Sequence, residues 1–163
     1  LIYLHSRSPP VIHGDLHDRN ILITAAGDAL ICDFGLSRIR HEVTRTHTTI
    51  RQGGRVRFVS PELSRGPDHF RSNEASDIYS LAMTIYSLGV GKKPLWNTEL
   101  DKKAAKLAEQ GMRPGFGIDS MDDLETFGGL GAAPSWILWT LLRQMWKHEP
   151  TERIAVSAVR DHL

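Results

Sequence analysis

The sequence predicts an α+β fold in which helices predominate. Stretches in the second half space apolar residues as helices do, most clearly in residues 77–90. Near the N-terminus, two short β-rich runs, ILIT (21–24) and ALICD (29–33), flank a turn and predict a hairpin. With 163 residues, 40% of them hydrophobic, the chain can bury one core, so we expect a single domain over residues 1–163.

The first part of the chain is expected to form short elements. Residues 1–6 have the character of a helix end, because Pro9 and Pro10 prevent the helix from continuing. Val11-Ile12 predicts a short strand, and the hairpin turn is expected at Ala26–Asp28. Residues 36–58 are polar, with several Thr and Arg, and predict a long loop.

The second part is expected to be mainly helical. Residues 77–90 are apolar on nearly all sides of a helix, which predicts a buried helix. Residues 100–110 predict an exposed amphipathic helix, and the Gly- and Pro-rich residues 111–134 predict a loop. Two further helices are expected at 136–147 and 154–163.

Composition excludes several classes of function. A net charge of +1 provides no strong field for nucleic acid or a membrane surface, and no apolar run is long enough to cross a membrane. The N-terminus has no secretory signal, and the single Cys32 fits a reducing compartment, so the cytoplasm is the default location. The opening LIYLHS has no Met and no helix cap, so we expect a fragment of a longer protein.

The stretch HGDLHDRN (His13–Asn20) has the residues of half a phosphoryl-transfer site. Such a site holds a metal, neutralises charge and orients a nucleophile. Asp15 can accept a hydroxyl proton and Asn20 can offer an oxygen to a metal. Asp33 follows the predicted hairpin, which brings it back beside Asn20. One oxygen from Asn20 and one from Asp33 would suit Mg²⁺. The alternative is that these are polar residues that cap loops.

Together with Asp33-Phe34-Gly35, this stretch resembles the catalytic loop and metal-binding triplet of the protein kinases, in the family's order and spacing. The resemblance implies ATP and Mg²⁺ as cofactors. It makes Asp15 the catalytic base, and Asn20 and Asp33 the magnesium ligands. Leu22 resembles the residue that floors the adenine pocket, with a plain strand core residue as the alternative. His13 and Phe34 are expected to stack behind the site.

Three later segments extend the resemblance. Phe58–Glu62 resembles the end of an activation segment, and Ser76–Leu81 the start of the family's central helix. The resemblance implies that Asp77 of that helix holds the catalytic loop through backbone N–H groups. The ending MWKHEPTERI carries a late Trp, Pro and Arg signature, which implies an ion pair between Glu62 and Arg153.

The resemblance covers only the larger, C-terminal lobe of the kinase fold. No Gly-rich phosphate loop and no strand with Val-Ala-Ile-Lys precedes His13–Asn20. We therefore expect the N-terminal lobe to be a missing part of the same longer chain. We also expect the 163 residues to be inactive alone and to expose an apolar cleft face.

His-Gly-Asp-Leu-His also resembles aminoglycoside and choline phosphotransferases, which act on small molecules. The activation-segment landmarks favour a protein substrate. The ending, with Gly111-Met112-Arg113-Pro114, resembles tyrosine-kinase-like Ser/Thr kinases, so Ser/Thr acceptors are expected. The segment from Asp33 to Glu62 carries six arginines against three acids, which favours either acidic substrates or simply a solvated loop.

Two departures from the family pattern bear on activity. Gly14 replaces the Arg that usually binds a phosphorylated activation loop, so activity is expected not to require phosphorylation of Thr44, Thr46, Thr48 or Thr49. His17 replaces the usual Lys, a fixed positive charge, and a His is only partly charged at pH 7. We expect His17 and Arg19 to steady the phosphate. A pseudokinase or scaffold that binds partners without turnover is the alternative.

Overall fold

The computed structural model describes residues 1–39, 55–64, 71–91, 94, 100–114 and 135–161, and it has the predicted helix-rich α+β architecture. The helices are α1 (Ile2–His5), α2 (Pro61–Ser64), α3 (Glu74–Val90), α4 (Asp101–Glu109), α6 (Ser135–Met145) and α7 (Val156–Arg160). The strands are β1 (Val11–Ile12), β2 (Ile21–Ile23), β3 (Ala29–Ile31) and β4 (Arg38–Ile39). Short 3₁₀ turns are η1 (Asp18–Asn20), η2 (Phe34–Leu36), η3 (Arg55–Arg57) and η4 (Pro150–Glu152).

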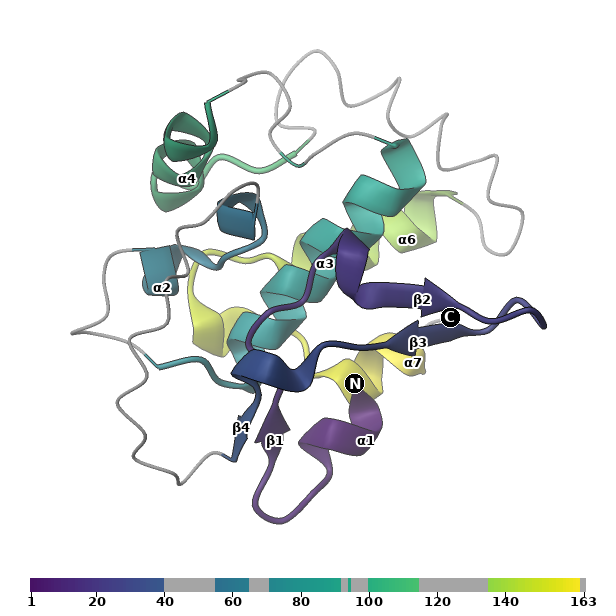
Figure 1. Cartoon of the computed structure of the whole chain (residues 1–163). Helices are drawn as coiled ribbons and strands as arrows, with labels where there is room; N and C mark the ends of the chain where they lie inside the picture. The colour runs from purple at the N-terminus through teal and green to yellow at the C-terminus, as the bar shows by residue number, and fades with distance from the viewer. Residues whose placement is uncertain (40–54, 65–70, 92–93, 95–99, 115–134, 162–163) are drawn as a thin grey trace.

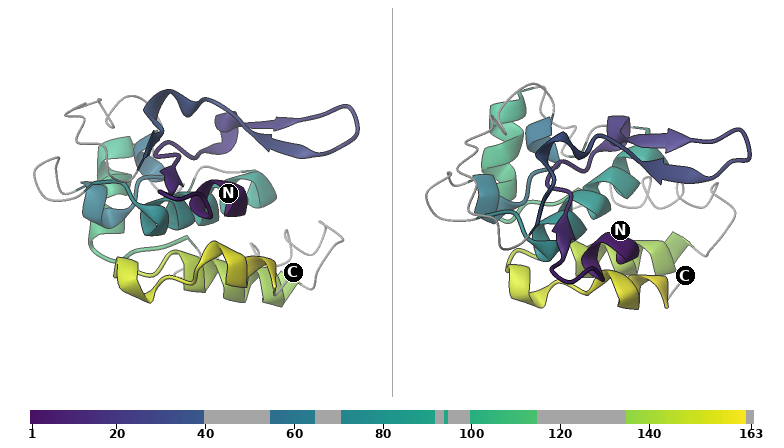
Figure 2. Two further views of the ribbon diagram at one scale, coloured as in Figure 1. Left: turned by 90° about the horizontal axis from the view of Figure 1, so that it is seen from below. Right: turned by 60° about the horizontal axis from the view of Figure 1, so that its bottom comes forward.

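Helix α3 is the central element of the fold (Figure 1). It runs between the layer of α6 and α7 on one side and the β2–β3 hairpin on the other (Figure 2). Buried side chains of α3 and α6 form the main core together with Trp146; they are Ile78, Tyr79, Ala82, Met83, Tyr86, Leu142 and Met145. The prediction of a buried helix is confirmed, since buried residues lie on both sides of α3.

The observed start of α3 is three residues earlier than predicted, because of a local cap. Asn73 and Ser76 form a reciprocal capping box, in which each side chain accepts from the other residue's backbone N–H at 2.9 Å. At the other end, Gly91 has a positive φ of 69°, a conformation that suits glycine at the end of a helix. The capping box places Asp77 within the first turn of α3, where it faces the catalytic loop.

The predicted hairpin is confirmed. Strands β2 and β3 pair antiparallel with Ile21 opposite Ile31, and Gly27 turns the chain with a positive φ of 91°. A second antiparallel pair joins β1 to β4. Strand β4 was not predicted, because it lies in the polar stretch 36–58 and is held by pairing with a distant strand. Residues 40–54 of that predicted loop lie outside the described residues.

Three further features of the helices differ from the prediction. Helix α4 is not simply exposed, because Ala104 and Ala108 are buried in a small cluster and α4 packs on η3 and α2. The last helix is shorter than 154–163, and α2 was not predicted at all. Most of the predicted loop 111–134 lies outside the described residues.

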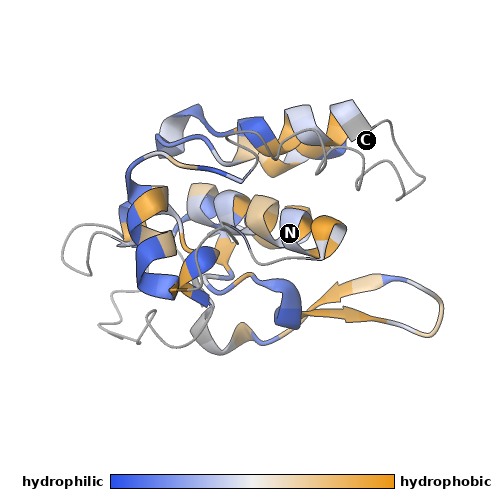
Figure 3. Ribbon diagram, turned by 90° about the horizontal axis from the view of Figure 1, so that it is seen from above, coloured by the Kyte–Doolittle hydropathy of each residue, from blue (hydrophilic) through white to orange (hydrophobic). Residues whose placement is uncertain are grey.

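The β2–β3 hairpin projects from the body, and its strands are coloured as hydrophobic (Figure 3). The side chains of Leu22, Ile23 and Leu30 are 53%, 67% and 52% exposed. The interpretation of Leu22 as a plain strand core residue is therefore wrong, because a two-stranded hairpin buries neither face unless something packs on it. In the part of the chain that is described, no helix is long and apolar enough to cross a membrane.

Candidate functional site

The catalytic loop is fixed to α3 by one buried carboxylate. Asp77 accepts hydrogen bonds from the backbone N–H of His13 at 2.8 Å and of Gly14 at 2.9 Å. This is the contact that the kinase resemblance implied. Gly14 has a positive φ of 78°, which is a conformation that glycine adopts at little cost. The loop therefore takes its shape from α3 before any ligand is considered.

A further residue at this anchor, His5, was missed by the sequence analysis. Its Nε2 lies 3.0 Å from Oδ2 of Asp77, and its side chain is buried. A carboxylate accepts hydrogen bonds, so Nε2 must carry the proton in this contact. The only signal in the sequence was a polar residue at the end of an apolar helix, which does not identify a partner more than seventy residues away.

Replacing His5 by Ala is expected to destabilise the protein by about 1–3 kcal/mol, because a buried acceptor loses a donor. The two backbone donors to Asp77 remain, so the loop should keep its path. Urea unfolding measures the first effect. A control is Tyr3→Ala, on the same short helix but exposed. Equal stability of the His5 and Tyr3 variants would contradict a contribution from the contact between His5 and Asp77.

Two hydrogen bonds link the segments that carry Asp15, Asn20 and Asp33. The side-chain amide of Asn20 donates to the carbonyl oxygen of Asp15 at 2.9 Å. The N–H of Cys32 donates to the carbonyl of Asn20 at 2.9 Å. Cys32 is thus paired with Asn20, and Asp33 is the next residue along the chain. This is how the hairpin returns the chain to the catalytic loop, as the sequence predicted.

The Asp33-Phe34-Gly35 triplet has a tight local shape. Asp33 adopts a left-handed conformation with φ of 61°, and its carboxylate accepts from the N–H of Gly35 at 3.2 Å. A Cβ at Gly35 would lie 3.0 Å from Oδ1 of Asp33, so a larger residue there would require the Asp33 carboxylate to shift. The Phe34 ring contacts the ring of His13 edge-on at 5.0 Å. His13 is fully buried, but Phe34 is 48% exposed and so is not enclosed in a core.

His17 is buried and turned toward Asp15. Burial lowers the pKa of His17, the charge of Asp15 offsets part of this, and Arg55 lowers the pKa further. The imidazole is therefore mainly neutral at pH 7. Its Nδ1 accepts from the N–H of Arg19. Its Nε2 is buried 3.8 Å from Oδ2 of Asp15 and has no hydrogen-bond partner among the described residues. Contact of His17 and Arg19 with a phosphate stays a prediction.

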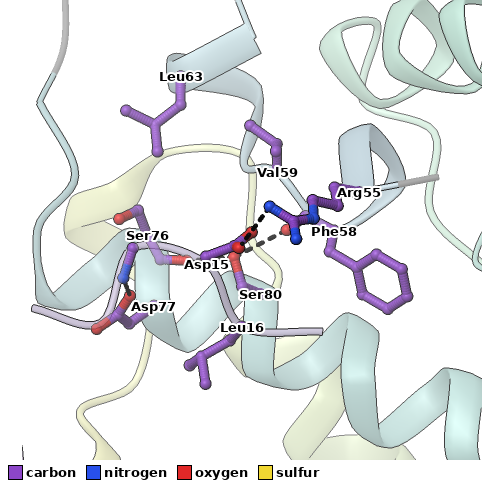
Figure 4. Close-up of a pocket in the computed structure, with 10 residues that line it drawn as sticks. Asp15, Leu16, Arg55, Phe58, Val59, Leu63, Ser76, Asp77 and Ser80 are labelled. Carbon is purple, nitrogen blue, oxygen red and sulfur yellow. Dashed lines mark hydrogen bonds and ion pairs between the residues drawn. The ribbon is translucent and has the colours of Figure 1, made fainter. Parts of the chain in front are cut away.

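One residue that the sequence did not assign to the site lies directly on Asp15. The Nη1 of Arg55 is 3.0 Å from Oδ2 of Asp15, whose side chain is only 12% exposed (Figure 4). Arg55 comes from η3, near the end of the expected activation segment. In the sequence, Arg55 was only one of six arginines in the segment from Asp33 to Glu62, and this did not predict a partner.

The predicted ion pair between Glu62 and Arg153 is present. The two guanidinium NH groups of Arg153 donate to the two carboxylate oxygens of Glu62, both at 2.7 Å, and both side chains are buried. Burial alone would raise the pKa of Glu62, but the hydrogen bonds and charge of Arg153 outweigh it and hold the pKa below its usual value. This pair fixes the end of the segment that carries Arg55.

The donor set at the hairpin end fits the expected magnesium ion in its chemistry. The amide nitrogen of Asn20 is engaged with Asp15, so the amide oxygen is the atom with which Asn20 can bind a cation. The Asp33 carboxylate uses one oxygen for Gly35 and is exposed. Among the described residues there is no cluster of three or more His, Cys, Asp or Glu for a metal. Mg²⁺ needs no such cluster when phosphates and water complete its shell.

The catalytic loop, the Asp33-Phe34-Gly35 triplet and the Glu62–Arg153 ion pair are the features that the resemblance to protein kinases implied. The model of the protein kinase domain family matches residues 1–163, and the chain belongs to this family. A probable serine/threonine-protein kinase of Dictyostelium discoideum is 36% identical over 107 residues, 65% of the chain. Serine/threonine-protein kinase CTR1 of Arabidopsis thaliana is 27% identical over 161 residues, 99% of the chain. Receptor-interacting serine/threonine-protein kinase 2 of Bos taurus is 29% identical over 154 residues, 93% of the chain.

The chain spans 11%, 17% and 27% of the lengths of these three relatives. All three are named as serine/threonine kinases, in agreement with the Ser/Thr character expected from the ending of the sequence. The match to the protein kinase model over the whole chain favours a protein kinase over the small-molecule phosphotransferases that His-Gly-Asp-Leu-His also resembles.

Proposed function

We propose that the protein containing this chain is an ATP- and Mg²⁺-dependent kinase that phosphorylates Ser or Thr in proteins. Asp15 orients the acceptor hydroxyl and takes its proton, while Asn20 and Asp33 hold Mg²⁺. The ion supplies positive charge against the phosphates. The observation that carries the proposal is that Asn20 bonds the backbone of Asp15 through its side chain and that of Cys32, the neighbour of Asp33, through its carbonyl, in a loop held on α3 by Asp77.

We further propose that residues 1–163 form the larger lobe of the kinase fold. The exposed apolar hairpin around Leu22 supports this, because such a surface needs a cover, and a nucleotide with a second lobe would provide one. The 163 residues contain no Gly-rich phosphate loop ahead of the catalytic loop. The chain alone should therefore transfer no phosphate.

The test is phosphate transfer from labelled ATP by the full-length protein, followed by phosphoamino acid analysis. Transfer should require Mg²⁺, and chelation by EDTA should reduce it to background, because the phosphate charge is then unneutralised. The label should appear on Ser or Thr. Label on Tyr alone would contradict the acceptor class, and transfer that persists in EDTA would contradict the magnesium site.

A pseudokinase is the second candidate, and one observation favours it. Arg55 pairs with the base Asp15, and His17 beside them is mainly neutral. In a pseudokinase the ion pair between Arg55 and Asp15 would never open, so Asp15 could not take the proton of an acceptor hydroxyl. ATP binding to the full-length protein without any transfer, under conditions where a related kinase is active, would support this candidate.

A further inference from the structure

The two arginines of η3 have different surroundings. Arg57 is buried, and its guanidinium bonds the carboxylate of Asp101 at 2.7 Å and the carbonyl of Pro94 at 3.0 Å. These contacts fix η3 against α4. Arg55, two residues earlier, lies on Asp15 at 3.0 Å with 43% of its side chain exposed. The position of Arg55 is therefore set by a rigid neighbour, while its guanidinium faces both the site and solvent.

Arg55 is a fixed positive charge at this place. A guanidinium stays protonated at all accessible pH values, whereas burial lowers the pKa of His17, the other basic group against Asp15. A guanidinium also has five N–H donors in a planar fork, more than one carboxylate oxygen can use. With almost half of its side chain exposed, Arg55 can bond a second anion that arrives from solvent.

We propose that Arg55 is a specificity-determining residue that selects acceptor hydroxyls with an anionic group, carboxylate or phosphate, on an adjacent residue. This rests on the proposed function. An acceptor hydroxyl must come within hydrogen-bond distance of the Asp15 carboxylate and so enters beside Arg55. An anion next to the hydroxyl then satisfies the guanidinium, while a Lys or Arg there is repelled by it.

The cavity beside the pair is too small to select a substrate by a large apolar side chain. It measures about 20 Å³, and its walls include Leu16, Phe58, Val59 and Leu63. A space of this size holds about one water molecule, so a large apolar side chain of the substrate cannot be buried in it. The general expectation was that a basic activation segment favours acidic substrates. The proposal assigns this preference to Arg55 and to the substrate position beside the acceptor hydroxyl.

The experiment compares peptides that differ only beside the acceptor, with Glu, phosphoserine, Ala or Lys there, using the full-length protein and its R55Q, R55K and R143Q variants. We expect the wild type to favour Glu over Lys by about fivefold in kcat/KM, the upper end of the range for an exposed ion pair, mainly through KM. R55Q should lose this ratio and R55K should keep most of it. R143Q removes the same charge from an exposed position on α6 and should leave the ratio unchanged.

An R55Q ratio equal to that of R143Q would overturn the inference. The phosphoserine and Glu peptides decide which anion is preferred. A second readout does not depend on turnover: fluorescence anisotropy measures the binding of the same peptides with Ala in place of the acceptor. If no peptide is phosphorylated, the proposed function fails. An acidic binding preference that R55Q removes would still support the role of Arg55, and equal binding of Glu and Lys peptides to the wild type would overturn it.

Discussion

Asp15→Asn is expected to reduce phosphate transfer by the full-length protein by about 10²- to 10⁴-fold in kcat, the usual contribution of a positioned general base. The amide has nearly the same shape but cannot take a proton at neutral pH. Asn20 bonds the backbone carbonyl of Asp15, and Asp77 holds the loop through backbone N–H groups, so neither contact is lost. The affinity for ATP should therefore stay close to that of the wild type.

The matched control is Asp28→Asn, which makes the same chemical change at the exposed turn of the hairpin. Asn is well tolerated in turns, so this variant should retain full activity. Steady-state kinetics and ATP titration measure the two effects separately. Activity of the Asp15 variant above a tenth of the wild type would show that another group takes the proton.

The sequence predicted the elements whose information is local. Helix α3 was predicted from the spacing of its own apolar residues, and the β2–β3 hairpin from two β-rich runs on either side of a turn at Gly27. Strand β4 and helix α2 were missed, because their residues lack the apolar character by which the equally short α1 and β1 were predicted. What holds them is contact with distant parts of the chain, as between β4 and β1.

The same distinction applies to the candidate site. The motifs placed Asp15, Asn20 and Asp33 in one loop system, since their spacing is short and a hairpin joins them. The contact of His5 with Asp77 and that of Arg55 with Asp15 join residues far apart in sequence, and no motif of the kinase resemblance named them, as it did Glu62 and Arg153. The exposure of Leu22 agrees with the expectation of an exposed apolar cleft face. The exposure of Phe34 was not predicted, because an apolar residue type does not tell whether another part of the structure covers it.

Arg153→Met is expected to destabilise the chain by about 3–5 kcal/mol at pH 7, because it leaves a buried carboxylate without its partner. Arg153 donates two hydrogen bonds of 2.7 Å to Glu62 and further bonds to three backbone carbonyls, those of Ala75, Lys147 and His148. Urea unfolding followed by tryptophan fluorescence measures the loss. The end of the activation segment should also loosen, since Glu62 is its anchor.

The pH dependence of this loss separates the charge effect from simple loss of packing. In the wild type the folded-state pKa of Glu62 is lowered, so the pair stabilises the protein above the ordinary pKa of about 4.3, and this stability is lost as the pH falls through the lower folded-state value. In Arg153→Met the hydrogen bonds and charge of Arg153 are gone. Burial, the largest influence on Glu62, then raises its pKa against the smaller lowering effects of its backbone hydrogen bond and of Ser60. The folded variant then prefers the protonated acid, so its stability should increase on acidification.

The cost of Arg153→Met should therefore be largest near pH 7 and shrink toward pH 4, where the carboxyl is neutral. The double variant Glu62→Gln with Arg153→Met is the control, because it removes the buried charge together with its partner. The double variant should be more stable than Arg153→Met at pH 7. It has no carboxylate at position 62 to protonate, so protonation at that position cannot make it more stable in acid. A cost of Arg153→Met that is constant between pH 4 and pH 7 would mean that lost hydrogen bonds to the carbonyls, rather than the unpaired Glu62, dominate at this anchor.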